Sequence, residues 1–315
     1  MNQDYKLSLI DHSLEPLQKI LEECTLCPRE CQIDRLKGQR GYCGAGKDLI
    51  VYTAFLHKGE EPPISGTNGS GTIFFSTCPL KCVYCQNYHF SHTLQGKILT
   101  DVDLAKIMLK LQGEGAHNIN LVTPTHFIPQ ILKGLAIAVK AGLNIPIVYN
   151  TSGYERKEII TRLNGIVDVY LADMRYISSG LAHRYSEAKN YPIFNQESLA
   201  EMYRQRPVNS IEEGVIKEGL IIRHLVFPGH IDESKSILSW IKNNAPKALV
   251  SVMFQYQPYF KATHYPEINR KIDPAEYSQV TGFLDTLNLK GWAQELEADE
   301  GLAGIHFESH LEKWL

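Results

Sequence analysis

Residues 71–87 read GTIFFSTCPLKCVYCQN, a short apolar run followed at once by three cysteines. The apolar residues 72–76 predict a buried strand. Cys78, Cys82 and Cys85 follow it with the spacing C-x3-C-x2-C. Three thiolates on one short loop provide ligands for three irons of a [4Fe–4S] cube and leave the fourth iron without a protein ligand. The stretch therefore predicts a strand that leads into an iron–sulfur site with one open metal position.

The rest of the chain alternates apolar runs with helical patterns. Five further runs are predicted strands: 118–122, 145–149, 167–172, 220–226 and 248–254. Helix signals lie between and after them, at the cap Thr100–Asp103, between Pro129 and Gly142, and from Asp273 onward. Such alternation predicts an α/β fold with a parallel sheet and right-handed crossovers. Six units of this kind are enough for an open or partial barrel.

The chain divides into two predicted parts. Residues 1–60 form an N-terminal metal-binding segment, and residues 61–315 carry the strand–helix alternation. Residues 173–219 separate two strands by more than an ordinary connection, so we expect an insertion around 176–215 that covers or shapes the active site.

Composition restricts the class of protein. Of 315 residues, 43% are hydrophobic and 21% charged, with a formal net charge of −3, which argues against a nucleic-acid partner. We expect no secretory signal and no membrane span, and therefore a cytoplasmic protein. All seven cysteines lie between Cys24 and Cys85. This clustering indicates metal chemistry in a reducing compartment more than a disulfide framework.

Polar residues follow several predicted strands directly. These are the segments 123–126 (TPTH), 150–153 (NTSG) and 255–257 (QYQ), together with Asp173 and Arg175. Since reactive groups in parallel α/β proteins gather at the carboxyl ends of the strands, we expect them to meet the cysteine loop at one rim. A lone histidine is more often packed than catalytic, so His126 is expected to be structural.

Several motifs together resemble the radical SAM (S-adenosylmethionine) superfamily. The cysteine spacing, with Tyr84 just before the last cysteine, resembles its signature, and 71–87 is most similar to the pyruvate formate-lyase activating enzyme group. The phrases CTLCPREC (24–31), GEEPPISG (59–66), NINLVTPTH (118–126) and PIVYNTSGY (146–154) resemble a branch of that group with an extra N-terminal four-cysteine motif. The similarity extends over about residues 60–260.

The resemblance implies a fold and a reaction. The fold would be a partial (β/α)6 barrel of radical SAM type with a cysteine-bearing N-terminal extension. SAM would chelate the open iron through its amino and carboxylate groups. An electron from a donor such as ferredoxin or flavodoxin would then cleave SAM reductively to a 5′-deoxyadenosyl radical, which abstracts hydrogen from the substrate.

The resemblance also implies where SAM binds. It assigns six cofactor-binding residues besides the cysteines: Thr123, Thr125, Asn150, Ser152, Asp173 and Arg175. The group usually has a Gly-Gly-Glu turn that holds the SAM amino group, and here that place reads Thr123-Pro124-Thr125. Hydroxyls, backbone carbonyls or another carboxylate would have to replace the missing acid. Arg175 would pair with the SAM carboxylate.

A second cysteine group precedes the first one. Cys24, Cys27, Cys31 and Cys43 have the spacing C-x2-C-x3-C-x11-C, with glycines and a proline between them. Four thiols fit a tetrahedral zinc ion and an auxiliary iron–sulfur cluster equally well by ligand number. Both readings stay open here.

The substrate is also open. By analogy it is a backbone glycine of a glycyl-radical-type partner protein, but a peptide or a small molecule is compatible with the altered turn. No catalytic side chain is assigned. The alternative function is a non-catalytic zinc-binding interaction module in which both cysteine groups are structural.

Overall fold

The computed structural model describes residues 3–296, 307–309 and 311–314. Within these residues the strands are β1 (Leu49–His57), β2 (Ser70–Phe75), β3 (Lys97–Leu99), β4 (Ile119–Val122), β5 (Ile147–Thr151), β6 (Val169–Asp173), β7 (Ser210–Glu212), β8 (Val215–Leu225), β9 (Leu249–Met253) and β10 (Gly291–Ala293).

The main sheet has the strand order β10-β9-β8-β6-β5-β4-β2-β1-β3. The six strands from β2 to β9 in this order are mutually parallel, and they match the six strands predicted from the apolar runs. The order fits a partial (β/α)6 barrel. Four further strands were not predicted. β1 and β3 run antiparallel on one edge, β10 pairs with β9 on the other, and β7 pairs only with β8.

Helices connect and cover the strands. The α-helices are α1 (Gln3–Lys19), α2 (Pro62–Ser65), α3 (Tyr88–Ser91), α4 (Asp101–Gly113), α5 (Ile128–Lys140), α6 (Lys157–Thr161), α7 (Ser179–Ser186), α8 (Tyr191–Gln205), α9 (Ile231–Asn244) and α10 (Pro274–Leu287). Short 3-10 turns are η1 (Ile20–Glu22), η2 (Thr125–Phe127), η3 (Ala262–His264), η4 (Pro266–Ile268) and η7 (Leu311–Lys313). None of the described helices combines the length and apolar character needed to cross a membrane.

The helix starts follow the sequence signals. The side chain of Thr100 accepts a hydrogen bond from the backbone N–H of Asp103, and Asp103 returns one, so α4 begins with a capping box. Asp273 and Glu276 form the same motif at α10. Pro129 lies in the first turn of α5, where its missing N–H costs nothing.

The sheet buries its two faces differently. One extended core joins the strands to the covering helices and reaches from Ile10 in α1 to Trp314. A smaller cluster lies on the other face, where Ile64 of α2 packs with Val148, Val169 and Ile221. Buried side chains on both faces explain why the parallel strands read as continuous apolar runs.

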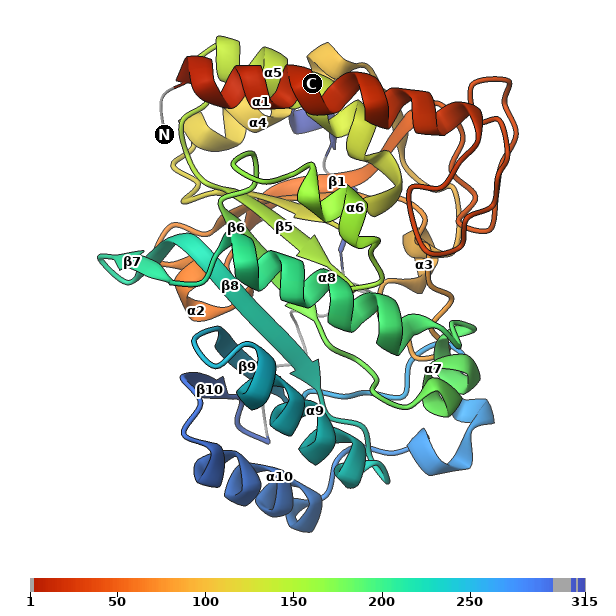
Figure 1. Ribbon diagram of the computed structural model, residues 1–315, viewed down its shortest axis with the longest axis vertical. Coiled ribbons are helices and arrows are strands. Elements are labelled where there is room, and N and C mark those ends of the chain that lie inside the picture. Colours follow the sequence, from red (N-terminus) through yellow and green to blue (C-terminus); the bar gives the residue numbers. More distant parts are fainter. Residues whose placement is uncertain (1–2, 297–306, 310, 315) are drawn as a thin grey trace.

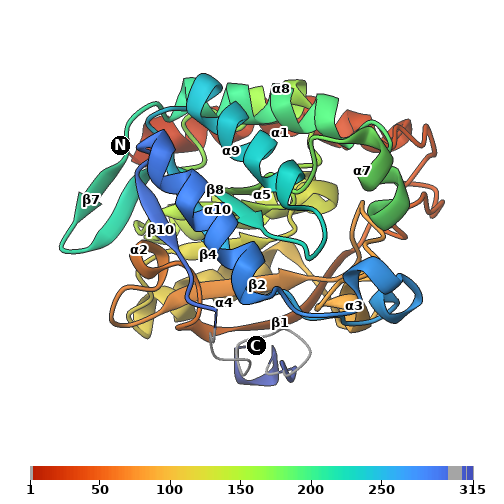
Figure 2. The ribbon, with the colours of Figure 1, turned by 90° about the horizontal axis from the view of Figure 1, so that it is seen from below.

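The cysteine-bearing end of the molecule coincides with the carboxyl ends of the strands. The arrows of β5 and β8 point toward the side that carries α3, α7 and the loops after α1, while the β7 hairpin projects on the opposite side (Figures 1 and 2). Residues 49–57, within the predicted N-terminal segment, form β1 of the same sheet. The division at residue 60 stays a prediction.

Candidate active site

The loop after β2 carries the three cysteines of the C-x3-C-x2-C motif. Thr77, the residue before Cys78, has a left-handed backbone with φ 66°. This conformation is strained for a β-branched residue and tends to occur at functional sites. It is held by a hydrogen bond of 2.9 Å from the Thr77 N–H to the carbonyl of Phe90. The chain therefore turns sharply where the strand ends and the cysteines begin.

Each thiol has a polar neighbour. The backbone N–H of Leu80 lies 3.4 Å from Cys78 Sγ, the Ser186 hydroxyl donates to Cys82 Sγ at 3.0 Å, and Cys85 Sγ lies 3.2 Å from Ser91 Oγ. Burial, together with the nearby Cys82, raises the pKa of Cys78 to about 12 and that of Cys85 to about 11. These thiols are protonated in the free protein, so a metal that binds here must displace their protons.

A chain of charged groups starts beside Cys82. Arg175 Nη1 lies 4.0 Å from Cys82 Sγ, and Arg175 Nη2 lies 2.5 Å from a carboxylate oxygen of Asp173. The other oxygen of Asp173 accepts a 2.8 Å hydrogen bond from Arg223. Burial alone would raise the pKa of Asp173, but Arg223 and Arg175 outweigh it and lower that pKa, so the carboxylate is ionised.

Arg175 keeps one free donor. Its Nε is buried and has no hydrogen-bond partner among the described residues. A buried guanidinium with an unused N–H next to a thiol loop is suited to an anionic ligand such as a carboxylate.

The turn after β5 is fixed by the insertion. The hydroxyl of Tyr191 lies 2.8 Å from the carbonyl of Ser152 and 3.1 Å from that of Asp173, and it accepts the N–H of Arg175 at 3.0 Å. Asn195 donates to the carbonyls of Gly153 and Asp173. Helix α8 thus ties the carboxyl ends of β5 and β6 together.

Asn150 belongs to the same group. Its side-chain oxygen accepts a 2.7 Å hydrogen bond from Arg223, and its amide nitrogen lies 3.4 Å from Glu60. Arg223 therefore joins Asn150 and Asp173, two of the residues that the sequence assigned to the site.

The threonines after β4 have other partners. The Thr125 hydroxyl is buried and donates to Glu155 at 2.6 Å, and the hydroxyl of Thr151 donates to the same oxygen. Thr123 has a left-handed φ of 57° and its N–H binds the carbonyl of Asn150. Neither Thr123 nor Thr125 lines the cavities at the carboxyl ends of the strands. Their contact with SAM stays a prediction.

Two adjoining cavities open at this rim. The smaller, of about 130 Å³, is lined by Tyr84, Cys85, Asp173 and Arg223 among others. The larger, of about 540 Å³, is lined by Asn150, Arg223, Glu60 and Glu61 among others. They share Gln86, Arg223, Met253, Gln255, Gln257 and Tyr259. The volume is in the range of small-molecule sites.

The second cysteine group also converges. All four of its cysteines, Cys24, Cys27, Cys31 and Cys43, line one small cavity of about 10 Å³. Burial raises the pKa of Cys27, and the charges of the other three thiols add to the effect. Arg35 is fully buried beside them, with Nη1 3.9 Å from Cys24 Sγ.

Two side chains connect the cysteine groups. Arg29, between Cys27 and Cys31, donates to the carbonyls of Pro79 at 3.0 Å and Ser186 at 3.3 Å. His126 accepts a hydrogen bond from Arg35 at its carbonyl, and its ring Nε2 donates to the carbonyl of Ser76 at 2.8 Å. Burial lowers the pKa of His126 to about 3, so the ring is neutral. The ring is packed in the interior, which agrees with a structural role, and that role stays a prediction.

The arrangement of the ligand side chains bears on which metal each cysteine group can hold. In the part of the chain that the structure describes, no three His, Cys, Asp or Glu side chains surround one point as the ligands of a single ion do. The thiolates of a four-iron cube each bind a different iron, so they stand farther apart than ligands of one zinc ion, whose Zn–S bonds measure about 2.3 Å. Three thiols on one loop, with Arg175 beside Cys82 and Cys85 on the smaller cavity, fit a cluster and a carboxylate-bearing ligand by their chemistry.

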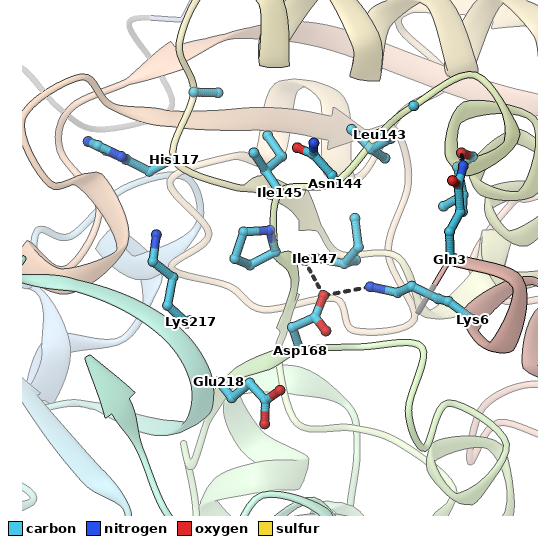
Figure 3. Close-up of a pocket in the computed structure, with 14 residues that line it drawn as sticks. Gln3, Lys6, His117, Leu143, Asn144, Ile145, Ile147, Asp168, Lys217 and Glu218 are labelled. Atoms are coloured by element: carbon cyan, nitrogen blue, oxygen red, sulfur yellow. Dashed lines mark hydrogen bonds and ion pairs between the residues drawn. The ribbon is translucent and has the colours of Figure 1, made fainter. Parts of the chain in front are cut away.

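A third cavity, of about 530 Å³, lies at the other end of the strands. It is lined by Lys6, His117, Asp168, Lys217 and Glu218 among others (Figure 3). Lys6 pairs with Asp168 at 2.7 Å, and Asp168 also accepts the N–H of Ile147, so these groups dock α1 on the sheet. No cysteine lines this cavity. Position at the amino ends of the strands indicates a role in stability.

A parallel sheet with cysteine thiols, a carboxylate and guanidinium groups at its carboxyl edge defines an α/β protein with a redox-metal site. A sequence model of the radical SAM superfamily matches residues 72–241. The uncharacterised protein MJ0674 of Methanocaldococcus jannaschii is 34% identical over 295 residues, which cover 90% of this chain and 80% of that protein. The chain belongs to the radical SAM superfamily, whose members use an iron–sulfur cluster and SAM.

Solved structures show a likeness of fold alone. SuiB of Streptococcus suis, bound to its precursor peptide SuiA, matches with a TM-score of 0.50 at 14% identity over 70% of this chain. The match covers 47% of SuiB, so this chain spans about half of its length. A domain of pyruvate-formate lyase-activating enzyme from Bacteroides vulgatus gives a TM-score of 0.34 at 12% identity, over 48% of this chain and 82% of that one.

Several residues of the site were missed from the sequence. These are His57, Glu60, Glu61, Ser186, Tyr191, Asn195 and Arg223. The phrase GEEPPISG and the many tyrosines of the insertion were visible signals, but neither indicates which strand end the side chains reach.

Glu155 generates a prediction about stability. Burial raises its pKa from 4.5 to about 7, against hydrogen bonds from Thr125, Thr151 and Tyr149. Between these values the folded chain holds a proton that the unfolded chain has released, so the stability contribution of this group falls as pH rises. Relative to Glu155→Gln, the wild type should lose at most about 3 kcal/mol of unfolding free energy between about pH 4.5 and pH 7.

Urea unfolding of the metal-free protein at several pH values measures this difference. Glu158→Gln, at an exposed position of α6, is the matched control. A constant difference between wild type and Glu155→Gln across the window would show that Glu155 is already ionised in the folded protein.

Proposed function

We propose that this protein reductively cleaves SAM at a [4Fe–4S] cluster held by Cys78, Cys82 and Cys85 and abstracts hydrogen from its substrate. The observation that carries the proposal is that Cys85 opens on the same cavity as Asp173 and Arg223, with Arg175 beside Cys82. When bound, the reduced cluster supplies the electron that splits SAM into methionine and a 5′-deoxyadenosyl radical.

The protein's own residues would position SAM. Arg175 has a free Nε for the SAM carboxylate and is held in place by Asp173 and Tyr191. Asn150 and Ser152 belong to the turn that α8 fixes against β6. Cys82 accepts a 3.0 Å hydrogen bond from Ser186, which orients its sulfur on the loop.

The assignment to a subgroup of the radical SAM superfamily rests on the sequence motifs. The resemblance of residues 71–87 supports membership of the pyruvate formate-lyase activating enzyme-like group, in a branch with the extra four-cysteine motif. The substrate is then a glycyl-radical-type protein, a peptide or a small molecule, and the electron donor is a ferredoxin or flavodoxin. The donor would approach near the cysteine-bearing loops, on the side that carries α3 and α7 (Figure 1).

The first test removes one ligand. Cys82→Ala should leave the chain folded and reduce dithionite-driven formation of 5′-deoxyadenosine to background, because two thiolates do not retain a competent cluster. The measurement is anaerobic turnover with circular dichroism as the check on folding. Undiminished 5′-deoxyadenosine from the variant would refute the assignment. A colourless wild type with zinc in place of iron would favour the interaction module.

The second proposal concerns the N-terminal cysteines, which we infer bind a second metal, either zinc or an auxiliary cluster. Its support is the convergence of four thiols, three of them buried, on one small cavity. Anaerobic metal analysis should find iron beyond the roughly four atoms of one [4Fe–4S] cluster, or about one zinc per chain.

The matched variant is the double substitution Cys24→Ser with Cys27→Ser. It should lose the additional metal and keep the iron at Cys78, Cys82 and Cys85. Equal metal content in wild type and variant would contradict a second site.

A further inference from the structure

The larger cavity at the carboxyl ends of the strands is lined by both apolar and acidic residues. Phe74, Val122, Met253, Trp292 and Phe307 contribute apolar surface. We call Glu60 and Glu61, in the segment before α2, and His57, at the end of β1, the acidic wall; the His57 ring lies edge-on to Phe74 and Phe307. An acidic wall inside a largely buried cavity requires a positive partner.

Arg223 neutralises the charge of the two glutamates only in part. Its Nη1 lies 3.6 Å from Glu60 and 3.8 Å from Glu61, distances too long for hydrogen bonds. Its Nε is already bound to Asp173 and its Nη2 to Asn150. The stronger contacts of Arg223 therefore point toward Asp173, and the two glutamates are left weakly paired.

Two side chains of this wall lack partners. Oε2 of Glu61 has no hydrogen-bond partner among the described residues, and neither has either ring nitrogen of His57. Both residues are 8% exposed. The nearest charged contact of the His57 ring is Glu60, at 3.7 Å from Nδ1. Buried polar atoms that stay unsatisfied in an otherwise well-bonded site indicate a ligand that completes them.

The charged groups beside the cavity indicate that this ligand is a cation. Three carboxylates, of Glu60, Glu61 and Asp173, share the guanidinium groups of Arg223 and Arg175. Lys58 also lines the cavity, but it is exposed to solvent at the rim. Burial raises the pKa of Glu61 to about 7, and a bound cation would favour its charged form.

The acidic wall lies away from the cluster loop. From Cys82 the ionic contacts run through Arg175, Asp173 and Arg223 before they reach the two glutamates. Ile64, three residues after Glu61, packs against Val148 and Val169, in the layer below Asn150 and Asp173. Two arginines and Asp173 thus lie between Cys82 and the two glutamates in this series of contacts.

We infer that Glu60, Glu61 and His57 form a subsite for a basic group of the substrate, a guanidinium or an alkylammonium. The inference rests on the proposed function, since it supplies the substrate class for that reaction. Carboxylates pair with guanidinium through charge-assisted hydrogen bonds, and the two ring nitrogens of His57, which have no partner among the described residues, offer a further polar contact. The apolar residues of the cavity would take the alkyl part of the same substrate.

The test measures binding of n-butylguanidinium to the cluster-loaded, anaerobic full chain with SAM present. n-Butylurea, neutral and of the same shape, is the control ligand. Calorimetry should show that the cation binds wild type and binds Glu61→Gln and Glu60→Gln about tenfold more weakly. Glu218→Gln, a glutamate of the cavity in Figure 3, should bind it like wild type. The affinity for SAM should be the same in all four proteins.

Two results would overturn the inference. One is equal binding of butylguanidinium and butylurea, or equal binding of the cation by all variants. The other is a loss of SAM affinity in Glu61→Gln with cation binding unchanged, which would assign the carboxylates to the SAM ammonium. If Glu61→Gln does not fold, His57→Gln, on a different element, takes its place in the test. This variant should also bind the cation more weakly than wild type.

The result of this binding test does not depend on whether the proposed reaction occurs, because cation binding requires no SAM cleavage. If wild type binds the cation selectively but makes no 5′-deoxyadenosine, the reaction assignment fails and the subsite stands.

Discussion

The site depends on a short loop that holds three thiols at the carboxyl end of β2. Its position is set by a strained Thr77, by the hydrogen bond of that residue to Phe90, and by the insertion, whose Ser186 donates to Cys82. Three thiolates on such a loop leave one iron of a cube open. Arg175 lies beside Cys82 on this loop and is joined through Asp173 to Arg223, so charged groups adjoin the thiols.

The N-terminal cysteines are part of this arrangement. Arg29 reaches from the second cysteine group to the carbonyl of Pro79 inside the first, and His126 bridges Arg35 and Ser76. These short polar contacts connect the N-terminal cysteine group with the start of the cluster loop. They hold the two cysteine groups in fixed positions relative to each other.

Much of the fold was predictable because its signals are local. Parallel strands buried on both faces read as apolar runs, and the capping boxes at Thr100 and Asp273 mark helix starts. The cysteine motif is equally local. The acidic wall was not predictable, because Glu60 and Glu61 follow an antiparallel strand and reach Arg223 only through tertiary packing. Thr125 was placed in the site by its position after β4, yet its hydroxyl is bound to Glu155.

The central claim is that SAM binds the open iron of a cluster held by Cys78, Cys82 and Cys85. Low-temperature electron paramagnetic resonance of the dithionite-reduced, anaerobic protein tests it most directly. The account predicts a reduced [4Fe–4S] signal that changes shape when SAM is added, because SAM becomes a ligand of the cluster. A signal that is identical with and without SAM would contradict the account.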